Sequence, residues 1–355
     1  MALYPTRVLD RVGALLDSAP RTADLEYHRL DLVATARMRR EGRAVPAELV
    51  TRERAAAVAA LAAPALLHRV RKATAGPLVL IKGPDVARYY PDPAERDFSD
   101  LDVLSPDALA TQRQLLRAGF QEVGEPELYE DIHHLRPLHW PGLPLVVEVH
   151  SAPKWIQGVE PPSAAELIAA AESEPVRPDG LLVLPAAHHA LVLAAHGWAH
   201  EPLARLRDLL DIALVTAAAD PDEVDRLAKR WGIWRMWRTT SRAIDAVVGD
   251  APRPLSVTLW ARHLESARER TVLESHLERV CGDIWGLPRN QLLAALTAIG
   301  ADVRPRSDEG WTAKVARSRA ALNNAFVPKS QHDQMLERKE TYDAASPSEA
   351  ATRVA

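Results

Sequence analysis

A group of strand patterns within residues 76–153 interrupts a chain whose apolar residues otherwise recur at helical spacing. Residues 77–84 are a short apolar run that ends in glycine and proline, which is typical of a buried strand. Polar and apolar residues alternate in 98–105, and a run of valines marks 144–153, so both segments predict strands. A helical pattern over 106–120 lies between them. This order of elements predicts an α+β fold built on a small mixed β-sheet.

Helical regions flank this core on both sides. Three stretches with helical spacing precede Gly76, and Pro46 stands at the start of the third, where its missing N–H costs nothing. Helical patterns resume at Ser163 and run to about residue 327. We therefore divide the chain into an N-terminal helical region (1–75), a sheet-containing core (76–160), a C-terminal helical domain (161–328) and a polar, flexible tail (329–355).

The composition argues against several classes of partner. The chain has 355 residues, of which 47% are hydrophobic and 26% charged, with a formal net charge of −4. This balance argues against duplex DNA or a membrane surface as a general partner, although it leaves a local basic patch open. No segment reaches the roughly 18 apolar residues that span a bilayer, and the N-terminus lacks the apolar core of a signal peptide. The lone Cys281 fits a buried side chain in a reducing compartment, so we expect a cytoplasmic protein.

Acidic residues mark two of the predicted strands. Side chains two positions apart on a strand point to the same face, so Asp100 and Asp102 project together while Leu101 and Val103 face the core. Neighbouring carboxylates repel each other unless water or a cation lies between them. Glu148 is a lone acid in the valine-rich strand, and three carboxylates converge if the two strands are neighbours. Such a set can hold the two magnesium ions of phosphoryl transfer. The alternative is that Asp100 and Asp102 simply form the solvent-exposed face of an edge strand.

Basic residues near these acids predict a phosphate site. Lys82 and Gly83 end the first predicted strand just before a possible helix start, where backbone N–H groups can cradle a phosphate. Lys82 supplies a point charge, and Arg96 supplies a fork suited to bidentate phosphate binding. The turn is not a P-loop, because the pattern G-x-x-x-x-G-K-[ST] is absent. The alternative for Lys82 and Arg96 is an ordinary surface position.

Together these residues resemble an uncharacterised bacterial nucleotidyltransferase family of the polymerase-beta-like superfamily. The resemblance covers roughly residues 76–216. It rests on a strand that ends in Lys-Gly, a Tyr-Pro pair, an arginine, an Asp-hydrophobic-Asp strand, a later acid beside a histidine, and two motifs in the following helical region. The matching residues are Lys82, Gly83, Tyr90, Pro91, Arg96, Asp100, Asp102, Glu148, His150, His196, Gly197, His200, Arg207 and Asp211.

The resemblance implies a metal-dependent transfer of a nucleoside monophosphate from an NTP co-substrate to an acceptor, with release of pyrophosphate. The implied mechanism uses two metal ions, Mg²⁺ or Mn²⁺: Asp100 and Asp102 would ligate both ions, and Glu148 would ligate the catalytic one and help to activate the acceptor hydroxyl. The acceptor, whether a small molecule, a peptide or RNA, is not implied. The chain departs from the wider superfamily at the turn, where Gly-Ser or Gly-Gly and a shorter spacing are usual. Here Asp100 stands seventeen positions after Gly83.

Three histidines fall on one face of a predicted helix. His189, His196 and His200 recur at helical spacing, but Gly197 stands where the glutamate of a metalloprotease motif would be. The histidines either hydrogen-bond at the interface with the core or line the nucleotide or acceptor pocket. His150, His196 and His200 are accordingly candidate contacts of the nucleotide.

A triplet of tryptophans also leaves two interpretations. Trp231, Trp234 and Trp237 recur at helical spacing, which favours core positions over a platform for stacking bases.

Two other functions remain compatible with the same residues. One is a toxin-like nucleotidyltransferase that modifies tRNA or a protein, and the other is a non-catalytic nucleotide-binding protein. The presence of all three acids argues against the second.

Overall fold

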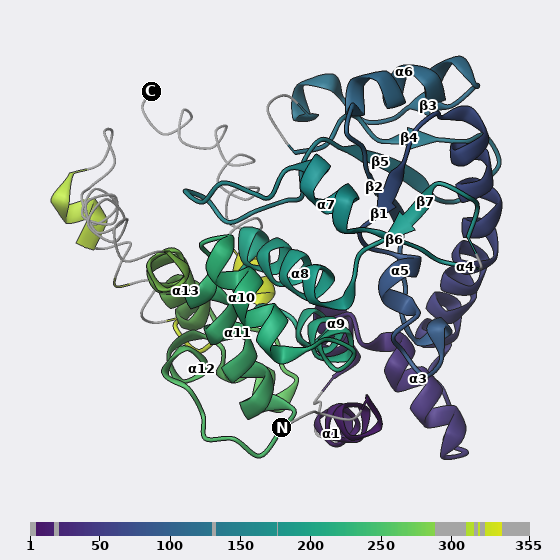
Figure 1. The fold of residues 1–355 in the computed structure, drawn as a ribbon. Coiled ribbons are helices and arrows are strands. Elements are labelled where there is room, and N and C mark those ends of the chain that lie inside the picture. Colours follow the sequence, from purple (N-terminus) through teal and green to yellow (C-terminus); the bar gives the residue numbers. More distant parts are fainter. Residues whose placement is uncertain are drawn as a thin grey trace, which may run out of the picture.

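A mixed β-sheet packs beside a large group of helices in the computed structural model (Figure 1). The structure describes residues 5–17, 21–129, 133–175, 177–287, 310–315, 319 and 324–335. Within them seven strands pair in the order β3-β4-β5-β2-β1-β7-β6, with parallel pairing of β2 with β5 and of β1 with β7. The strands are β1 (Leu78–Leu80), β2 (Asp100–Leu104), β3 (Gln121–Glu122), β4 (Leu138–His139), β5 (Val146–His150), β6 (Glu172–Ser173) and β7 (Leu181–Val183). The predicted α+β class with a mixed sheet is confirmed.

Helices precede and follow the sheet, as the apolar spacing predicts. The N-terminal helices are α1 (Pro5–Asp17), α2 (Thr22–His28), α3 (Asp31–Arg40) and α4 (Ala47–Ala73). Short helices within the sheet region are α5 (Pro84–Ala87), η1 (Pro93–Glu95), α6 (Ala108–Arg117), η2 (Pro126–Tyr129) and α7 (Ala164–Ala170). The C-terminal helices are α8 (Ala186–His200), α9 (Leu206–Thr216), α10 (Pro221–Arg230), α11 (Trp234–Val247), α12 (Leu255–Trp260), η3 (Arg262–Ser266) and α13 (Val272–Gly286).

The sheet extends beyond the strands that the sequence predicts. Strands β6 and β7 come from a part of the chain that the apolar spacing predicts to be helical, and β7 pairs with β1. These strands have two and three residues, which is too short for a period-two pattern to appear. The boundary placed at residue 160 stays a prediction, but two strands from beyond it complete the sheet.

The two faces of the sheet contact different helices (Figure 1). Alternate strand residues, Leu101, Val103, Val147 and Val149, share a buried cluster with α4. The opposite face belongs to a second cluster, in which Leu104 of β2 packs with α8 and α9. Because strand side chains alternate, Asp100, Asp102 and Glu148 lie on the α8 side of the sheet.

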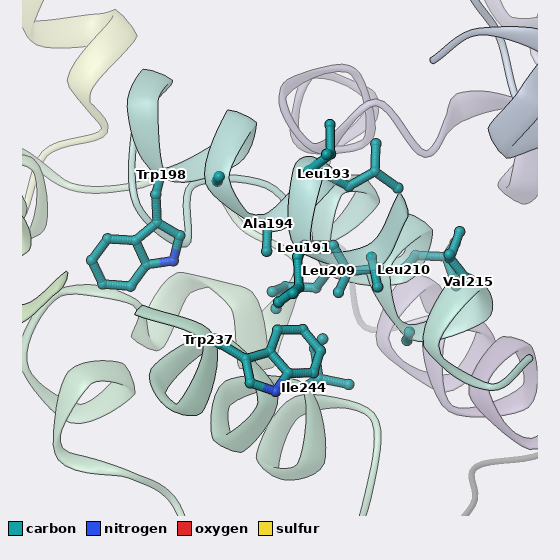
Figure 2. Packing of buried hydrophobic residues seen from close by; sticks show 14 of the residues in the cluster. Leu191, Leu193, Ala194, Trp198, Leu209, Leu210, Val215, Trp237 and Ile244 are labelled. Atoms are coloured by element: carbon teal, nitrogen blue, oxygen red, sulfur yellow. The ribbon is translucent and has the colours of Figure 1, made fainter. Parts of the chain in front are cut away.

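The C-terminal helices form their own core around α8. Figure 2 shows Leu191 and Ala194 of α8 packed with Leu209 of α9 and with Trp237 and Ile244 of α11. All five are buried, so α8 is covered on several sides. Of the three tryptophans at helical spacing, Trp231 and Trp237 are core residues, whereas Trp234 is only half-buried.

Several predictions about the ends of the elements can be compared with the structure. The predicted second helix is split, because Arg29 adopts a left-handed conformation (φ 53°) between α2 and α3. Pro46 is the residue just before α4 rather than its first residue. Residues 329–335 are helical, and the rest of the predicted flexible tail, 336–355, lies outside the described residues, as do most of the helices predicted after residue 287. None of the described helices combines the length and the apolar character needed to cross a membrane.

Candidate functional site

The acidic residues meet where β2 and β5 run side by side. The parallel register places Asp102 opposite Glu148 and Leu104 opposite His150. Ligand atoms of Asp102, Glu148 and His150 all lie within 4.8 Å of one another. Asp100 is not part of this group of three, although it lines the pocket in front of it. The predicted adjacency of the two acidic strands is therefore confirmed, with His150 as an additional close neighbour.

Asp102 is a fully buried carboxylate with one oxygen free. Its Oδ1 lies 3.2 Å from Lys82 Nζ and 2.9 Å from His150 Nε2. Its Oδ2 is buried and has no hydrogen-bond partner among the described residues. Burial alone would raise the pKa of Asp102, but the charge of Lys82 and the hydrogen bond to His150 hold this pKa well below its usual range. Asp102 is therefore an anion whose second oxygen can accept another ligand.

The environments of Asp100 and His150 follow from this anion. Burial, and then the charge of Asp102, raise the pKa of Asp100. Burial would lower the pKa of His150, but its hydrogen bond to Asp102 and the nearby carboxylate of Glu148 outweigh burial and raise it. The raised pKa of Asp100 shows that a second negative charge beside Asp102 is unfavourable as the site stands, and a cation bound on the pocket side of β2 would relieve this repulsion.

The Lys82–Gly83 turn brings a positive charge to the acids. Gly83 has φ 63° and ψ −124°, a backbone conformation that favours glycine, and an added Cβ would lie 3.1 Å from the carbonyl oxygen of Asp100. Lys82 Nζ lies between Asp102 and His196, whose Nε2 is 2.9 Å away. The glycine is thus needed for the close approach of this turn to β2.

Arg96 is buried in an ion pair behind the same turn. Its Nη2 donates to Asp211 Oδ2 (2.9 Å), and its Nη1 donates to the carbonyl oxygens of Asp97 (3.1 Å) and Gly83 (3.4 Å). Tyr90 Oη donates to Asp211 Oδ1 (2.7 Å). These contacts make Arg96 an anchor that joins the Gly83 turn to α9, and the phosphate contact of Arg96 stays a prediction.

The three helix histidines divide between the two interpretations. His189 is fully buried, and its Nε2 lies 3.0 Å from the carbonyl oxygen of Ile81, so it is a hydrogen-bonded interface residue. His196 and His200 line the pocket, and His200 Nδ1 lies 2.9 Å from Lys154 Nζ. Burial and the charge of Lys82 lower the pKa of His196, and burial with Lys154 lowers that of His200 to about 4. Both imidazoles are therefore neutral near pH 7 and accept hydrogen bonds from the lysines.

A pocket of about 590 Å³ connects these side chains. The sheet contributes Asp100 and Glu148, while α8 contributes His196 and His200. Further charged or titratable side chains that the sequence motifs do not single out are Arg29, Asp97, His133, His134, Lys154, Glu201, Arg205 and Asp208. They come from loops and helix ends far apart in the chain, so no local spacing predicts them. The carboxylates of Asp100 and Glu148 mark the sheet side of the pocket, and lysines and arginines are interleaved with further acids in the remaining wall.

The turn between α8 and α9 forms one wall of this pocket, and distant side chains hold it. His28 Nδ1 accepts the backbone N–H of Leu206 (3.2 Å), and His28 Nε2 donates to the carbonyl oxygen of Arg268 (2.8 Å). His263 Nε2 donates to the carbonyl oxygen of Ala204 (2.9 Å), and Arg270 Nη2 donates to that of Pro202 (3.0 Å). Residues from α2 and from the region after α12 therefore fix the backbone of the pocket wall.

Replacing the buried His28 should weaken the acid sensitivity of the fold. Burial lowers the pKa of His28 from 6.5 to about 4. The unfolded chain therefore binds this proton more readily, and stability falls as the pH drops from about 6.5 to about 4, by about 3 kcal/mol in total. In urea unfolding at pH 7, 5.5 and 4.5, we expect the stability of His28→Gln relative to the wild type to improve as the pH falls. Equal pH dependence of the two proteins would show that His28 binds a proton without unfolding.

A mixed sheet whose neighbouring strands present carboxylates to a pocket with lysines and arginines is typical of proteins that transfer nucleotidyl groups. A family model described as uncharacterised nucleotidyltransferase matches residues 22–247, which is more than half of the chain. The chain belongs to this nucleotidyltransferase family. No curated protein and no solved structure matches it.

Proposed function

We propose that this protein transfers a nucleoside monophosphate from an NTP to a hydroxyl-bearing acceptor and releases pyrophosphate. The acceptor oxygen forms a bond to the α-phosphorus, the bond from that phosphorus to the bridging oxygen of the β-phosphate breaks, and pyrophosphate leaves. The observation that carries the proposal is the pairing of the buried Asp102 with Glu148 across β2 and β5, where Glu148 lines a pocket that also holds basic side chains.

A divalent cation fits the sheet side of this pocket. Asp102 Oδ2 is buried and lacks a hydrogen-bond partner among the described residues, and carboxylates are the ligands that Mg²⁺ and Mn²⁺ prefer in phosphate-transfer sites. Asp102 and Glu148 would hold the ion, with Asp100 as the third acid at the pocket. When bound, the cation would supply positive charge to the phosphate oxygens.

The basic side chains suit the triphosphate of the nucleotide. Lys82 and Lys154 each bond a neutral histidine, so their charges are not cancelled by those partners, although Lys82 also contacts Asp102. Arg29 and Arg205 line the same pocket, whose volume of about 590 Å³ lies in the usual range for small-molecule sites. We assign Lys82, Lys154 and Arg205 to the phosphates, and we assign Arg96 to holding the Gly83 turn in place.

Glu148 is the acid best placed for the acceptor. Its side chain is 20% exposed and faces the pocket, whereas Asp102 is fully buried. His134 Nε2 and His150 Nε2 lie 3.8 Å and 3.7 Å from Glu148 Oε2. We propose that Glu148 takes the proton of the acceptor hydroxyl as the new bond forms.

The test is pyrophosphate release from each of the four NTPs with Mg²⁺ or Mn²⁺, against small-molecule, peptide and RNA acceptors. We expect release with one acceptor class, its loss on chelation with EDTA, and its recovery when the ion is restored. Calorimetry of Mg–NTP binding provides a second measurement. Binding without release for any acceptor would contradict transfer and favour a nucleotide-binding protein, while the absence of both would overturn the proposal.

A further inference from the structure

A second hollow, of about 580 Å³, lies between α10, α11 and α13 and shares no lining residue with the nucleotide pocket. Cations dominate its lining. Lys229 comes from α10, and Arg235, Arg238 and Arg242 recur along one side of α11. None of these four forms an ion pair with another described residue, whereas the neighbouring Arg230 is paired with Glu166.

The single carboxylate of this lining does little to cancel their charge. Asp225 accepts a hydrogen bond from the indole Nε1–H of Trp237 (3.2 Å) and is not in contact with the arginines through an ion pair. Three arginines and a lysine against one carboxylate leave a local positive charge on a chain whose formal net charge is −4. Such a concentration of unpaired cations costs free energy through mutual repulsion unless an anion binds there.

Two indole rings accompany the cations. Trp234 opens α11 and is half-buried, with Lys229 Nζ 4.7 Å and Arg238 Cζ 5.2 Å from its ring centroid. Trp285 of α13 also lines the hollow and packs edge-on against the buried Trp260, with 5.3 Å between ring centroids. This packing fixes the orientation of Trp285, while part of its surface stays accessible. The hollow thus combines flat aromatic surfaces with cations that are already stacked beside them.

We propose that this hollow binds single-stranded nucleic acid, with phosphates on the arginines and a base against an indole. Aromatic rings interleaved with cations are the means by which proteins hold single strands, because each nucleotide presents one anionic group and one flat base. In a duplex the bases are stacked on one another, so neither indole of the hollow could stack on a base. An acidic peptide would use the arginines and leave the tryptophans without a partner. This inference does not depend on the proposed nucleotidyl transfer.

The test is fluorescence anisotropy with labelled 12-nucleotide single-stranded RNA and DNA, without NTP or divalent cation, over a range of salt concentrations. We expect binding in about the micromolar range at low salt, and no effect of the pocket variant Asp102→Asn. The double variant Arg238→Glu, Arg242→Glu should weaken binding at least about tenfold and lower the slope of log K against log salt by about 1.4, since each lost phosphate contact removes about 0.7.

The matched control reverses two arginines elsewhere. Arg113 and Arg117 are also exposed and also stand four positions apart on a helix, α6. Arg113→Glu, Arg117→Glu changes the net charge by the same amount and should bind like the wild type. Equal weakening by the two double variants would overturn the proposal, since it would reduce the effect to net charge.

The indole is tested separately. Trp234→Leu should weaken single-strand binding about fivefold or more, and Trp234→Phe should restore part of it, because stacking contributes about 1–3 kcal/mol per base. Thermal unfolding checks that the variants fold. If Trp234→Leu does not fold, the double variant Arg238→Glu, Arg242→Glu and its control decide the test. Equal binding of a duplex of the same sequence, or stronger binding of polyglutamate than of RNA, would overturn the proposal in favour of another anionic partner.

Discussion

Asp102→Asn should lower kcat/KM for nucleotidyl transfer by about 10²- to 10³-fold, since loss of a cation ligand removes several kcal/mol of charge stabilisation and each 1.4 kcal/mol is about tenfold. The substitution keeps the shape of the side chain but removes the anion that Lys82 and His150 contact. Steady-state kinetics with the acceptor that supports pyrophosphate release in the assay proposed above measures the loss. Mn²⁺ binding, followed by electron paramagnetic resonance, should weaken in parallel.

The control for this variant is an acid-to-amide change at the far edge of the same sheet. Glu122 of β3 pairs with Arg136 and takes no part in the pocket. Glu122→Gln should leave the kinetics and the Mn²⁺ binding unchanged. An Asp102→Asn protein that folds and retains more than about a tenth of the activity would remove the basis of the proposed cation site.

Asp211→Asn should destabilise the folded protein by about 3–5 kcal/mol, because it leaves the charge of Arg96 buried without a counter-ion. The side chains of Arg96 and Asp211 are only 5% and 6% exposed. Tyr90→Phe removes one hydrogen bond to Asp211 and should cost less, about 1.5 kcal/mol. Urea unfolding at pH 7, followed by tryptophan fluorescence, gives both free energies of unfolding.

A double variant distinguishes a charge effect from simple loss of packing. Arg96→Met, Asp211→Asn removes the unpaired charge, so it should be more stable than Asp211→Asn alone. A double variant no more stable than Asp211→Asn would contradict this account and would assign the stability to the hydrogen bonds of Arg96 with the Gly83 turn.

The sequence predicts the acidic strands β2 and β5 better than it predicts the outer strands of the sheet. The alternation in Asp100-Leu101-Asp102 is a local pattern, and the register with Glu148 follows once two strands of this character are neighbours. Strand β7 escapes prediction because three apolar residues carry no readable period. The class of fold and the meeting of the acidic strands could therefore be predicted, but not the full sheet.

The walls of the pocket could not be predicted because they depend on long-range contacts. Arg29, Lys154 and Arg205 reach the pocket from three separate loops, and none of them is part of a motif that signals a binding role. Arg96 shows the opposite problem. Its spacing from Asp100 suits a phosphate ligand and it lines the pocket, but it also donates to Asp211 and to backbone carbonyl oxygens, so its contact with a phosphate stays a prediction. Local spacing indicates which residue types are near a site, whereas tertiary packing decides which of them are free to bind.

The hydrogen bonds that hold the α8–α9 turn affect where this chain can be truncated. The region that matches the family ends at residue 247, yet His263 and Arg270 hold the backbone of Ala204 and Pro202 from beyond that limit. A fragment trimmed to residues 22–247 would keep the acids of β2 and β5. It would lose the hydrogen bonds of His263 and Arg270 to the α8–α9 turn. The structural unit that supports the pocket therefore extends beyond residue 247, because part of the support of the α8–α9 turn comes from η3 and the residues that follow it.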